Sequence, residues 1–316
     1  MQKTPSKLEI LINWQCNQRC IFCSVGHKLV GDGGIRTWSE IKKDLELAKK
    51  RDASIVSFSG GEPTIRKDLV KGVRLAHDIG FETIEIQTNG CMLKYKEYFE
   101  ELVGAGVNRV LVSIHAPNAE LEDFLTQTKG SFEAKLQGLR YLEEFNIEKR
   151  TNTVINRYNY KLLPEMAKFL LKFKKNTKTN HLNFIIPDGF AKQNFQELVP
   201  KMSEAKPFIE KACGILVKGG ATPFLHNLYP CIVSGYSHAM AELSTTDTIL
   251  IGPNFMIDLQ ENRHKYRVKG PQCKNCKYYH LCVGPFKEYT KIMGFSEFKP
   301  VKGEKLKPGE FRLQNY

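Results

Sequence analysis

Residues 16–23 read CNQRCIFC, so three of the chain's 9 cysteines fall within one short stretch. Three residues separate Cys16 from Cys20, and two separate Cys20 from Cys23. The stretch directly follows LEILINW (8–14), whose alternating apolar residues predict a strand. Reactive residues of parallel β/α proteins collect in the loops that follow the strands. We therefore expect three thiols at the functional end of the first strand.

The sequence around this stretch alternates between strand and helix patterns. Apolar residues recur at helical spacing between the strands, as Trp38, Ile41, Leu45 and Ala48 do. The strand candidates are LEILINW (8–14), SIVSFSG (54–60), TIEIQTNG (83–90), RVLVSIHA (109–116), RTNTVIN (150–156) and LNFIIP (182–187). Six β/α units are fewer than the eight of a closed barrel. The predicted fold class is α/β, an open, partial (β/α)6 TIM-type barrel.

The pattern changes after Gly189. We expect a barrel domain over residues 1–189 and a smaller C-terminal module over residues 190–316, with a helix over about 203–217. Five of the 9 cysteines lie in this second part. The predicted module is therefore a small cluster-binding or metal-binding unit.

The composition is that of a globular protein, with 41% hydrophobic and 26% charged residues among 316. No run of about 18 apolar residues predicts a membrane span, and the start has no apolar segment of signal-peptide length. A cytoplasmic location is expected, and clustered cysteines there are more often metal ligands than disulfides. The net charge of +13 suits an RNA partner. A lysine-rich solvated surface is the preferred interpretation, because aromatic residues do not alternate with the charges.

Three thiolates in one loop favour an iron-sulfur cluster over structural zinc. A structural zinc site needs four ligands, and here no fourth lies at a fixed spacing, although His27 is nearby. A four-iron cluster with three cysteine ligands keeps one iron open to an added ligand.

The CX3CX2C pattern after a first strand, with Phe22 before the last cysteine, resembles that of the radical S-adenosylmethionine (radical SAM) superfamily. The resemblance implies an oxygen-sensitive [4Fe-4S] cluster on Cys16, Cys20 and Cys23, whose open iron binds S-adenosylmethionine. Members of this family split S-adenosylmethionine reductively into methionine and a 5'-deoxyadenosyl radical, which abstracts hydrogen from a substrate. Phe22 is included among the residues expected around the cofactor.

A second motif, SGGEP (59–63), follows the second predicted strand and agrees with the same family. The resemblance implies that Gly60, Gly61 and Glu62 meet the methionine ammonium of the cofactor. Two glycines let backbone approach a ligand closely. Further contacts with the carboxylate and ribose are expected at the ends of later strands, from Asn89, Ser113 and Asn152. No spacing selects a catalytic acid or base.

The C-terminal stretch CKNCKYYHLC (273–282), with Cys231 about forty residues upstream, can close a four-ligand metal site. Zinc and a second iron-sulfur cluster both fit this spacing. The pattern resembles the SPASM and twitch modules, which implies one auxiliary [4Fe-4S] cluster on Cys231, Cys273, Cys276 and Cys282. A rival set replaces Cys282 with Cys213. The full SPASM pattern has seven cysteines, and five are present here.

The resemblance implies a radical SAM enzyme, an oxidoreductase or modifying enzyme, that acts on a peptide side chain or a small metabolite. The auxiliary cluster would then transfer electrons. A reductant such as flavodoxin or ferredoxin is an expected partner, and a peptide substrate would require a peptide-carrier protein. Two alternatives stay open: radical SAM modification of RNA, and an iron-sulfur scaffold or electron carrier without radical catalysis.

Overall fold

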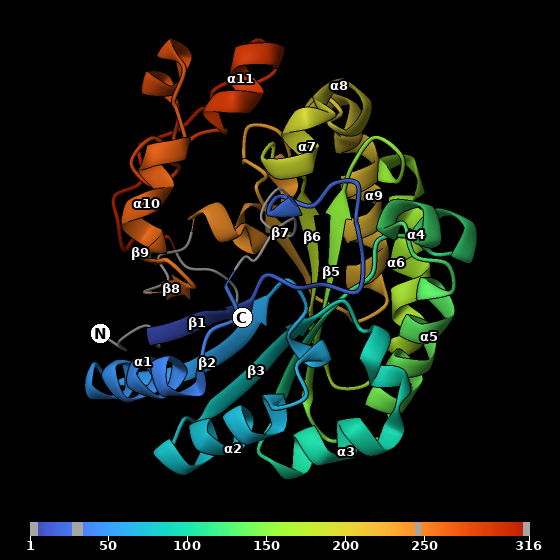
Figure 1. Ribbon diagram of the computed structural model, residues 1–316. Coiled ribbons are helices and arrows are strands. Elements are labelled where there is room, and N and C mark those ends of the chain that lie inside the picture. The colour runs from blue at the N-terminus through green and yellow to red at the C-terminus, as the bar shows by residue number, and fades with distance from the viewer. Residues whose placement is uncertain (1–5, 27–33, 244–247, 312–316) are drawn as a thin grey trace.

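The computed structural model describes residues 6–26, 34–243 and 248–311. A curved sheet flanked by helices runs through these residues (Figure 1), in the strand order β7-β6-β5-β4-β3-β2-β1-β8-β9. The strands are β1 (Ser6–Asn13), β2 (Ala53–Gly60), β3 (Thr83–Thr88), β4 (Arg109–Ser113), β5 (Glu148–Ile155), β6 (Thr177–Phe184), β7 (Pro223–His226), β8 (Thr248–Gly252) and β9 (Phe255–Asp258).

Neighbouring strands pair in parallel, except that β8 and β9 are antiparallel. Strands β7 and β9 are the two edges of the sheet in the described residues, so the barrel is open. Because the main strands are parallel, their carboxyl ends meet at one rim, where β/α proteins build their sites.

Helices line the outer side of the barrel strands, as Figure 1 shows. The helices in the described ranges are α1 (Trp38–Lys50), α2 (Leu69–Ile79), α3 (Lys96–Gly104), α4 (Ala119–Thr126), α5 (Ser131–Leu142), α6 (Leu163–Leu170), α7 (Gly189–Gln193), α8 (Phe195–Leu198), α9 (Met202–Lys218), α10 (Leu259–Tyr266) and α11 (Lys287–Met293). Of these, α10 and α11 lie at the upper left of the view, away from the helices on the outer side. Helix α1 begins in a capping box, in which Thr37 and Glu40 exchange side-chain and backbone hydrogen bonds. Its apolar stripe, Ile41, Leu45 and Ala48, is buried.

The two faces of the strands differ in chemistry. In β5, Lys149, Thr151, Thr153 and Ile155 are buried, whereas the alternating residues are half-buried. Because the helices cover the buried set, the half-buried set, which includes Asn152, faces the inside of the barrel. This inner face carries polar side chains that can meet a ligand.

The predicted open barrel is confirmed, since all six expected strands form in parallel register. The sixth strand was placed too late, at 182–187, and the structure has it at Thr177–Phe184. Its polar inward residues hide the strand pattern in TKTNHLNF. The sequence analysis does not predict strands β7 and β8, which have 4 and 5 residues. They extend the sheet at its two sides, next to β6 and β1.

Among the described residues, no helix has the length and apolar character needed to cross a membrane.

Two leucines of α1 test the packing of the helix against the sheet. Leu45 is 0% exposed and Leu47 is 39% exposed. Replacing Leu45 with Ala should lower the free energy of unfolding by about 2–5 kcal/mol, because it leaves a cavity. Leu47→Ala should change it by about 0.5 kcal/mol or less. Urea denaturation of both variants measures this, and equal losses would contradict the assigned face of α1.

Candidate functional site

The cysteine loop leaves the carboxyl end of β1 and is held from two sides. The backbone N–H groups of Arg19 and Ile21 donate to carbonyls in the last turn of α4, over 3.1 and 3.0 Å. On the other side, the N–H of Phe190 in α7 donates to the carbonyl of Cys23 over 3.0 Å. The loop is therefore a fixed part of the fold, with all three thiols at the rim of the barrel.

The three thiols of this loop lie close enough to affect one another's ionisation. Burial raises the pKa of Cys16 to about 11, and the charges of Glu62 and Cys23 add to this shift. Burial also raises the pKa values of Cys20 and Cys23. The thiols are therefore protonated at neutral pH in the protein alone, and binding a metal cluster must release protons.

The glycines of the SGGEP turn make room for the cysteine loop. The N–H of Gly61 donates to the carbonyl of Asn13 over 2.9 Å, and that of Glu62 donates to Gln15 over 2.7 Å. A Cβ atom on Gly61 would lie 2.1 Å from the Gln15 carbonyl oxygen. Gly60 has a φ of +137°, a conformation that favours glycine. The turn after β2 thus holds the start of the loop after β1 through direct backbone contact.

The Glu62 carboxylate links the ends of β2 and β3. One oxygen accepts from the Thr64 N–H over 2.9 Å and from the Thr88 hydroxyl over 2.7 Å, while the other accepts from the Asn89 N–H over 2.6 Å. Glu62 is 1% exposed, and burial raises its pKa, while these hydrogen bonds oppose the shift. The Glu62 side chain therefore fixes the relative positions of the two strand ends.

The other expected cofactor residues lie along the same rim. Asn89 follows β3 and reaches the cysteine loop, where its side-chain amide donates to the Asn17 side-chain oxygen over 2.7 Å. Ser113 and Asn152 are direct partners in the β4–β5 register. Phe22 is buried, and its ring meets that of His115 edge-on at 4.7 Å. The structure thus brings these residues to neighbouring strand ends.

Two imidazoles on the inner face extend this row. His181 is the register partner of Asn152, and its Nδ1 lies 3.1 Å from Nε2 of His226. The Nε2 atom of His181 lies 2.8 Å from the Thr179 hydroxyl. Burial lowers the pKa of His226 to about 4, and it also lowers the pKa of His181. Both rings are therefore neutral at neutral pH and can pass a proton from one to the other. The sequence did not single out this pair, because its members come from separate strands.

A second set of cysteines surrounds one cavity in the C-terminal part. The other walls of the cavity are mostly aromatic and apolar, with Tyr229, Tyr278 and Phe298 among them. The cysteines that line it are Cys231, Cys273, Cys276 and Cys282. Burial raises the pKa of Cys282 to about 12, and each neighbouring thiolate would raise that of Cys231 further. Four thiolates cannot share such a cavity without cations to balance them.

The donor set around this cavity fits an iron-sulfur cluster. Within the described ranges, no three His, Cys, Asp or Glu side chains are grouped so as to hold a single metal ion. Each cysteine of a four-iron cluster binds a different iron, so the sulfurs stand farther apart than the ligands of one ion. Cys213 is 0% exposed within α9 and is not among the residues that line the cavity. His27 lies outside the described residues.

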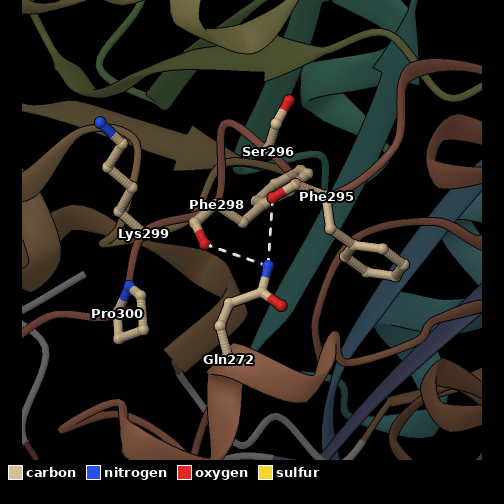
Figure 2. Close-up of a pocket in the computed structure, with 6 residues that line it drawn as sticks. All are labelled: Gln272, Phe295, Ser296, Phe298, Lys299 and Pro300. Atoms are coloured by element: carbon tan, nitrogen blue, oxygen red, sulfur yellow. Dashed lines mark hydrogen bonds between the residues drawn. The ribbon is translucent and has the colours of Figure 1, made fainter.

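A separate open hollow lies beside the cysteine cavity. Figure 2 shows its six lining residues, with the Gln272 amide donating to the carbonyls of Phe295 and Phe298 over 3.1 and 3.3 Å. Phe298 also lines the cysteine cavity. Apart from Lys299, the hollow has no ionisable side chain. We assign it to packing of the segment that follows α11, because it contains no cysteine, histidine or carboxylate that could bind a metal.

Comparison with known proteins agrees with this geometry. The family model described as the Radical SAM superfamily matches residues 13–170, half of the chain. The chain therefore belongs to the radical SAM superfamily, as the cysteine loop and SGGEP turn predicted.

Curated relatives match part of the chain. A probable GTP 3',8-cyclase from Saccharolobus islandicus is 32% identical over 207 residues, which are 65% of this chain and 64% of the cyclase. An AdoMet-dependent heme synthase from Methanosarcina barkeri is 32% identical over 184 residues, 57% of this chain and 51% of the synthase. The chain thus matches less than two thirds of the length of these relatives.

Solved structures with the same fold span nearly the whole chain. SuiB of Streptococcus suis, bound to S-adenosylmethionine, has a TM-score of 0.69 at 16% identity and covers 94% of this chain and 76% of its own. The enzyme anSMEcpe with bound AdoMet has a TM-score of 0.67 at 13% identity and covers 96% of this chain and 93% of its own. At this identity the likeness concerns the fold, and it includes the C-terminal part.

The sequence analysis did not identify the polar side chains that connect the cysteine loop to α5. Gln18 donates to Cys91 Sγ over 3.2 Å and to Ser131 over 2.7 Å. Lys135 is buried in α5, although lysine normally marks a solvent face. One signal was available: Lys135 shares the apolar stripe of Phe132 and Leu139, where a charge requires a partner.

Substitution of Gly61 tests the close backbone contact between the SGGEP turn and the cysteine loop. Gly61→Ala should push the loop away, because the added Cβ meets backbone rather than a flexible side chain. We expect the iron bound per chain after anaerobic reconstitution to fall to about half or less, with an unchanged circular dichroism spectrum. Gly104→Ala is the matched control, since nothing lies within 4 Å of the added atom. Wild-type iron content in Gly61→Ala would show that the close approach is unnecessary.

Proposed function

We propose that the protein reductively cleaves S-adenosylmethionine and uses the resulting radical to abstract hydrogen from a small metabolite or a peptide side chain. Membership of the radical SAM superfamily supports the reaction class. When bound, a [4Fe-4S] cluster with an open iron supplies the electron that breaks the carbon–sulfur bond of the cofactor. The observation that carries the proposal is the clustering of three half-buried thiols at the rim, against the Gly60–Glu62 turn.

The proposed roles follow the positions of the side chains. Cys16, Cys20 and Cys23 would hold the cluster, and the turn of Gly60, Gly61 and Glu62 would fix the cofactor's methionine end. Because both Glu62 oxygens already accept hydrogen bonds, we propose that Glu62 acts partly by orienting this turn. The positions of four further residues at neighbouring strand ends support contacts with the rest of the cofactor; they are Phe22, Asn89, Ser113 and Asn152.

The substrate is proposed to lie farther along the inner face, over β5 to β7. The His181–His226 pair is next to Asn152 in the register and provides neutral proton donors and acceptors there. The curated relatives include a probable GTP 3',8-cyclase, and the fold neighbours include SuiB bound to the precursor peptide SuiA. A nucleotide and a peptide are therefore the first substrate classes to test, and a peptide would require a carrier protein.

We further propose an auxiliary [4Fe-4S] cluster on Cys231, Cys273, Cys276 and Cys282, in a functional module of residues 190–316 that serves the barrel of residues 1–189. The common cavity of these four thiols supports this set over the one with Cys213. With four cysteine ligands, such a cluster has no open iron and would transfer electrons. The N–H of Gly284 donates to Cys282 Sγ over 3.3 Å, a contact of the kind that tunes cluster potentials.

A cytoplasmic location and a reductant such as flavodoxin or ferredoxin complete the proposal. All nine cysteines are free thiols, which supports a reducing compartment. Binding to RNA is the less favoured partner, and it would be recognised by a steep salt dependence.

The reaction is tested by anaerobic incubation of the reconstituted protein with S-adenosylmethionine and dithionite. We expect 5'-deoxyadenosine and methionine in equal amounts, and at least a hundredfold less from Cys20→Ala, because one iron then loses its protein ligand. Cys91→Ala, a buried cysteine of the same rim, should retain iron binding and cleavage. Failure of the wild type to form 5'-deoxyadenosine while holding a full cluster would favour a scaffold or electron carrier.

Iron and sulfide quantification tests the auxiliary ligand set. We expect about eight irons in the wild type and about four in Cys282→Ala, since one of two four-iron clusters is lost. Cys213→Ala should keep about eight, because its thiol lies outside the cavity. Loss of iron in Cys213→Ala alone, or a zinc ion in place of four irons, would refute the proposed set.

A further inference from the structure

A buried ion pair lies directly behind the cysteine loop. Lys135 of α5 and Glu122 of α4 both have 0% of their side chains exposed, and Lys135 Nζ lies 2.5 Å from Glu122 Oε1. The other Glu122 oxygen accepts from the backbone N–H groups of His115 and Ala116, each over 2.7 Å. These contacts fix the pair against the end of β4, at the same rim as the thiols.

The helix that carries the lysine contacts the cysteine loop. Gln18 of the loop donates to Cys91 Sγ over 3.2 Å and to the hydroxyl of Ser131, one turn before Lys135 in α5, over 2.7 Å. A Cβ atom on Gly90, in the turn after β3, would lie 3.6 Å from Lys135 Cγ, so the lysine stem runs beneath that turn. Burial raises the pKa of Cys20, and the Lys135 ammonium opposes this shift more strongly than the Glu122 carboxylate adds to it. The ammonium also opposes the raised pKa of Cys91.

The other strong charges on Cys20 are negative. They are the Glu122 carboxylate and, once a cluster is bound, the thiolates of Cys16 and Cys23. Lys135 is the cation among these strongest influences on the thiol. In a buried setting such a charge acts with little screening.

We infer that Lys135 is a positioning residue that acts through Cys20 to raise the reduction potential of the cluster held by the 16–23 loop, with Glu122 opposing it. This inference rests on the proposed function. Adding an electron makes the cluster more negative, so a fixed cation stabilises the reduced form. The Glu122 carboxylate, which is paired with the lysine, limits this effect.

The chain contains a matched control. Lys149 in β5 is also 0% exposed and pairs with Glu143, whose side chain is 25% exposed, so removing it likewise leaves a carboxylate without its lysine. It lies at the amino end of β5, opposite to the rim, and it is not among the strongest charges on Cys20 or Cys91. Lys149→Met therefore reports the cost of removing a buried lysine without changing the field at the cysteine loop.

The experiment is an EPR-monitored redox titration of the full reconstituted chain, following the signal that responds to S-adenosylmethionine. At a fixed potential, Lys135→Met should lower the ratio of reduced to oxidised cluster about tenfold, which is about 59 mV for one electron. Glu122→Gln should raise this ratio, and Lys135→Arg and Lys149→Met should leave it within about twofold. The signal that does not respond to S-adenosylmethionine is an internal control.

The opposite signs separate a field effect from misfolding. An unchanged midpoint in Lys135→Met, or a shift of the same sign in Glu122→Gln, would overturn the inference while the proposed function stands. If Lys135→Met does not fold, Glu122→Gln alone tests the inference, because its midpoint potential is expected to rise, whereas misfolding would not raise it. A wild-type protein with no signal that responds to S-adenosylmethionine would instead refute the proposed function.

Discussion

The backbone contact between the end of β1 and the Gly60–Glu62 turn is the constraint on which the rim depends. Two hydrogen bonds cross this contact, and the missing Cβ of Gly61 permits it. The Glu62 carboxylate then carries the constraint onward to Thr88 and Asn89 at the end of β3. Three strand ends are thereby fixed to one another, and the cysteine loop starts from a rigid base. A site that holds a reactive species requires such fixed geometry.

The two cysteine sets differ in a way that matches different tasks. The loop of Cys16 to Cys23 offers three thiols beside a polar row that leads along the inner face of the barrel. The cavity of Cys231 to Cys282 offers four thiols, enclosed mostly by aromatic and apolar side chains. Three ligands leave one iron for chemistry, whereas four leave none. The strands β7 and β8 attach the second part of the chain to both sides of the barrel sheet.

Local motifs made much of the fold and rim predictable from the sequence. The CX3CX2C loop and the SGGEP turn each lie within a few residues and directly follow strands, so their places follow from the topology. Pairs between distant elements were not predictable in this way. Lys135 and Glu122 lie on different helices, and His181 and His226 on different strands, so only the folded chain joins them. The sixth strand was misplaced for a related reason: its inward polar residues suit a site rather than a core.

The most direct test of the central claim is the EPR spectrum of the dithionite-reduced protein before and after addition of S-adenosylmethionine. A cluster with an iron open to the cofactor should change its signal when the cofactor's amino and carboxylate groups bind, and replacement of Cys16 should abolish that change. Spectra that superimpose with and without the cofactor, from a protein that contains a complete four-iron cluster on the 16–23 loop, would contradict the account.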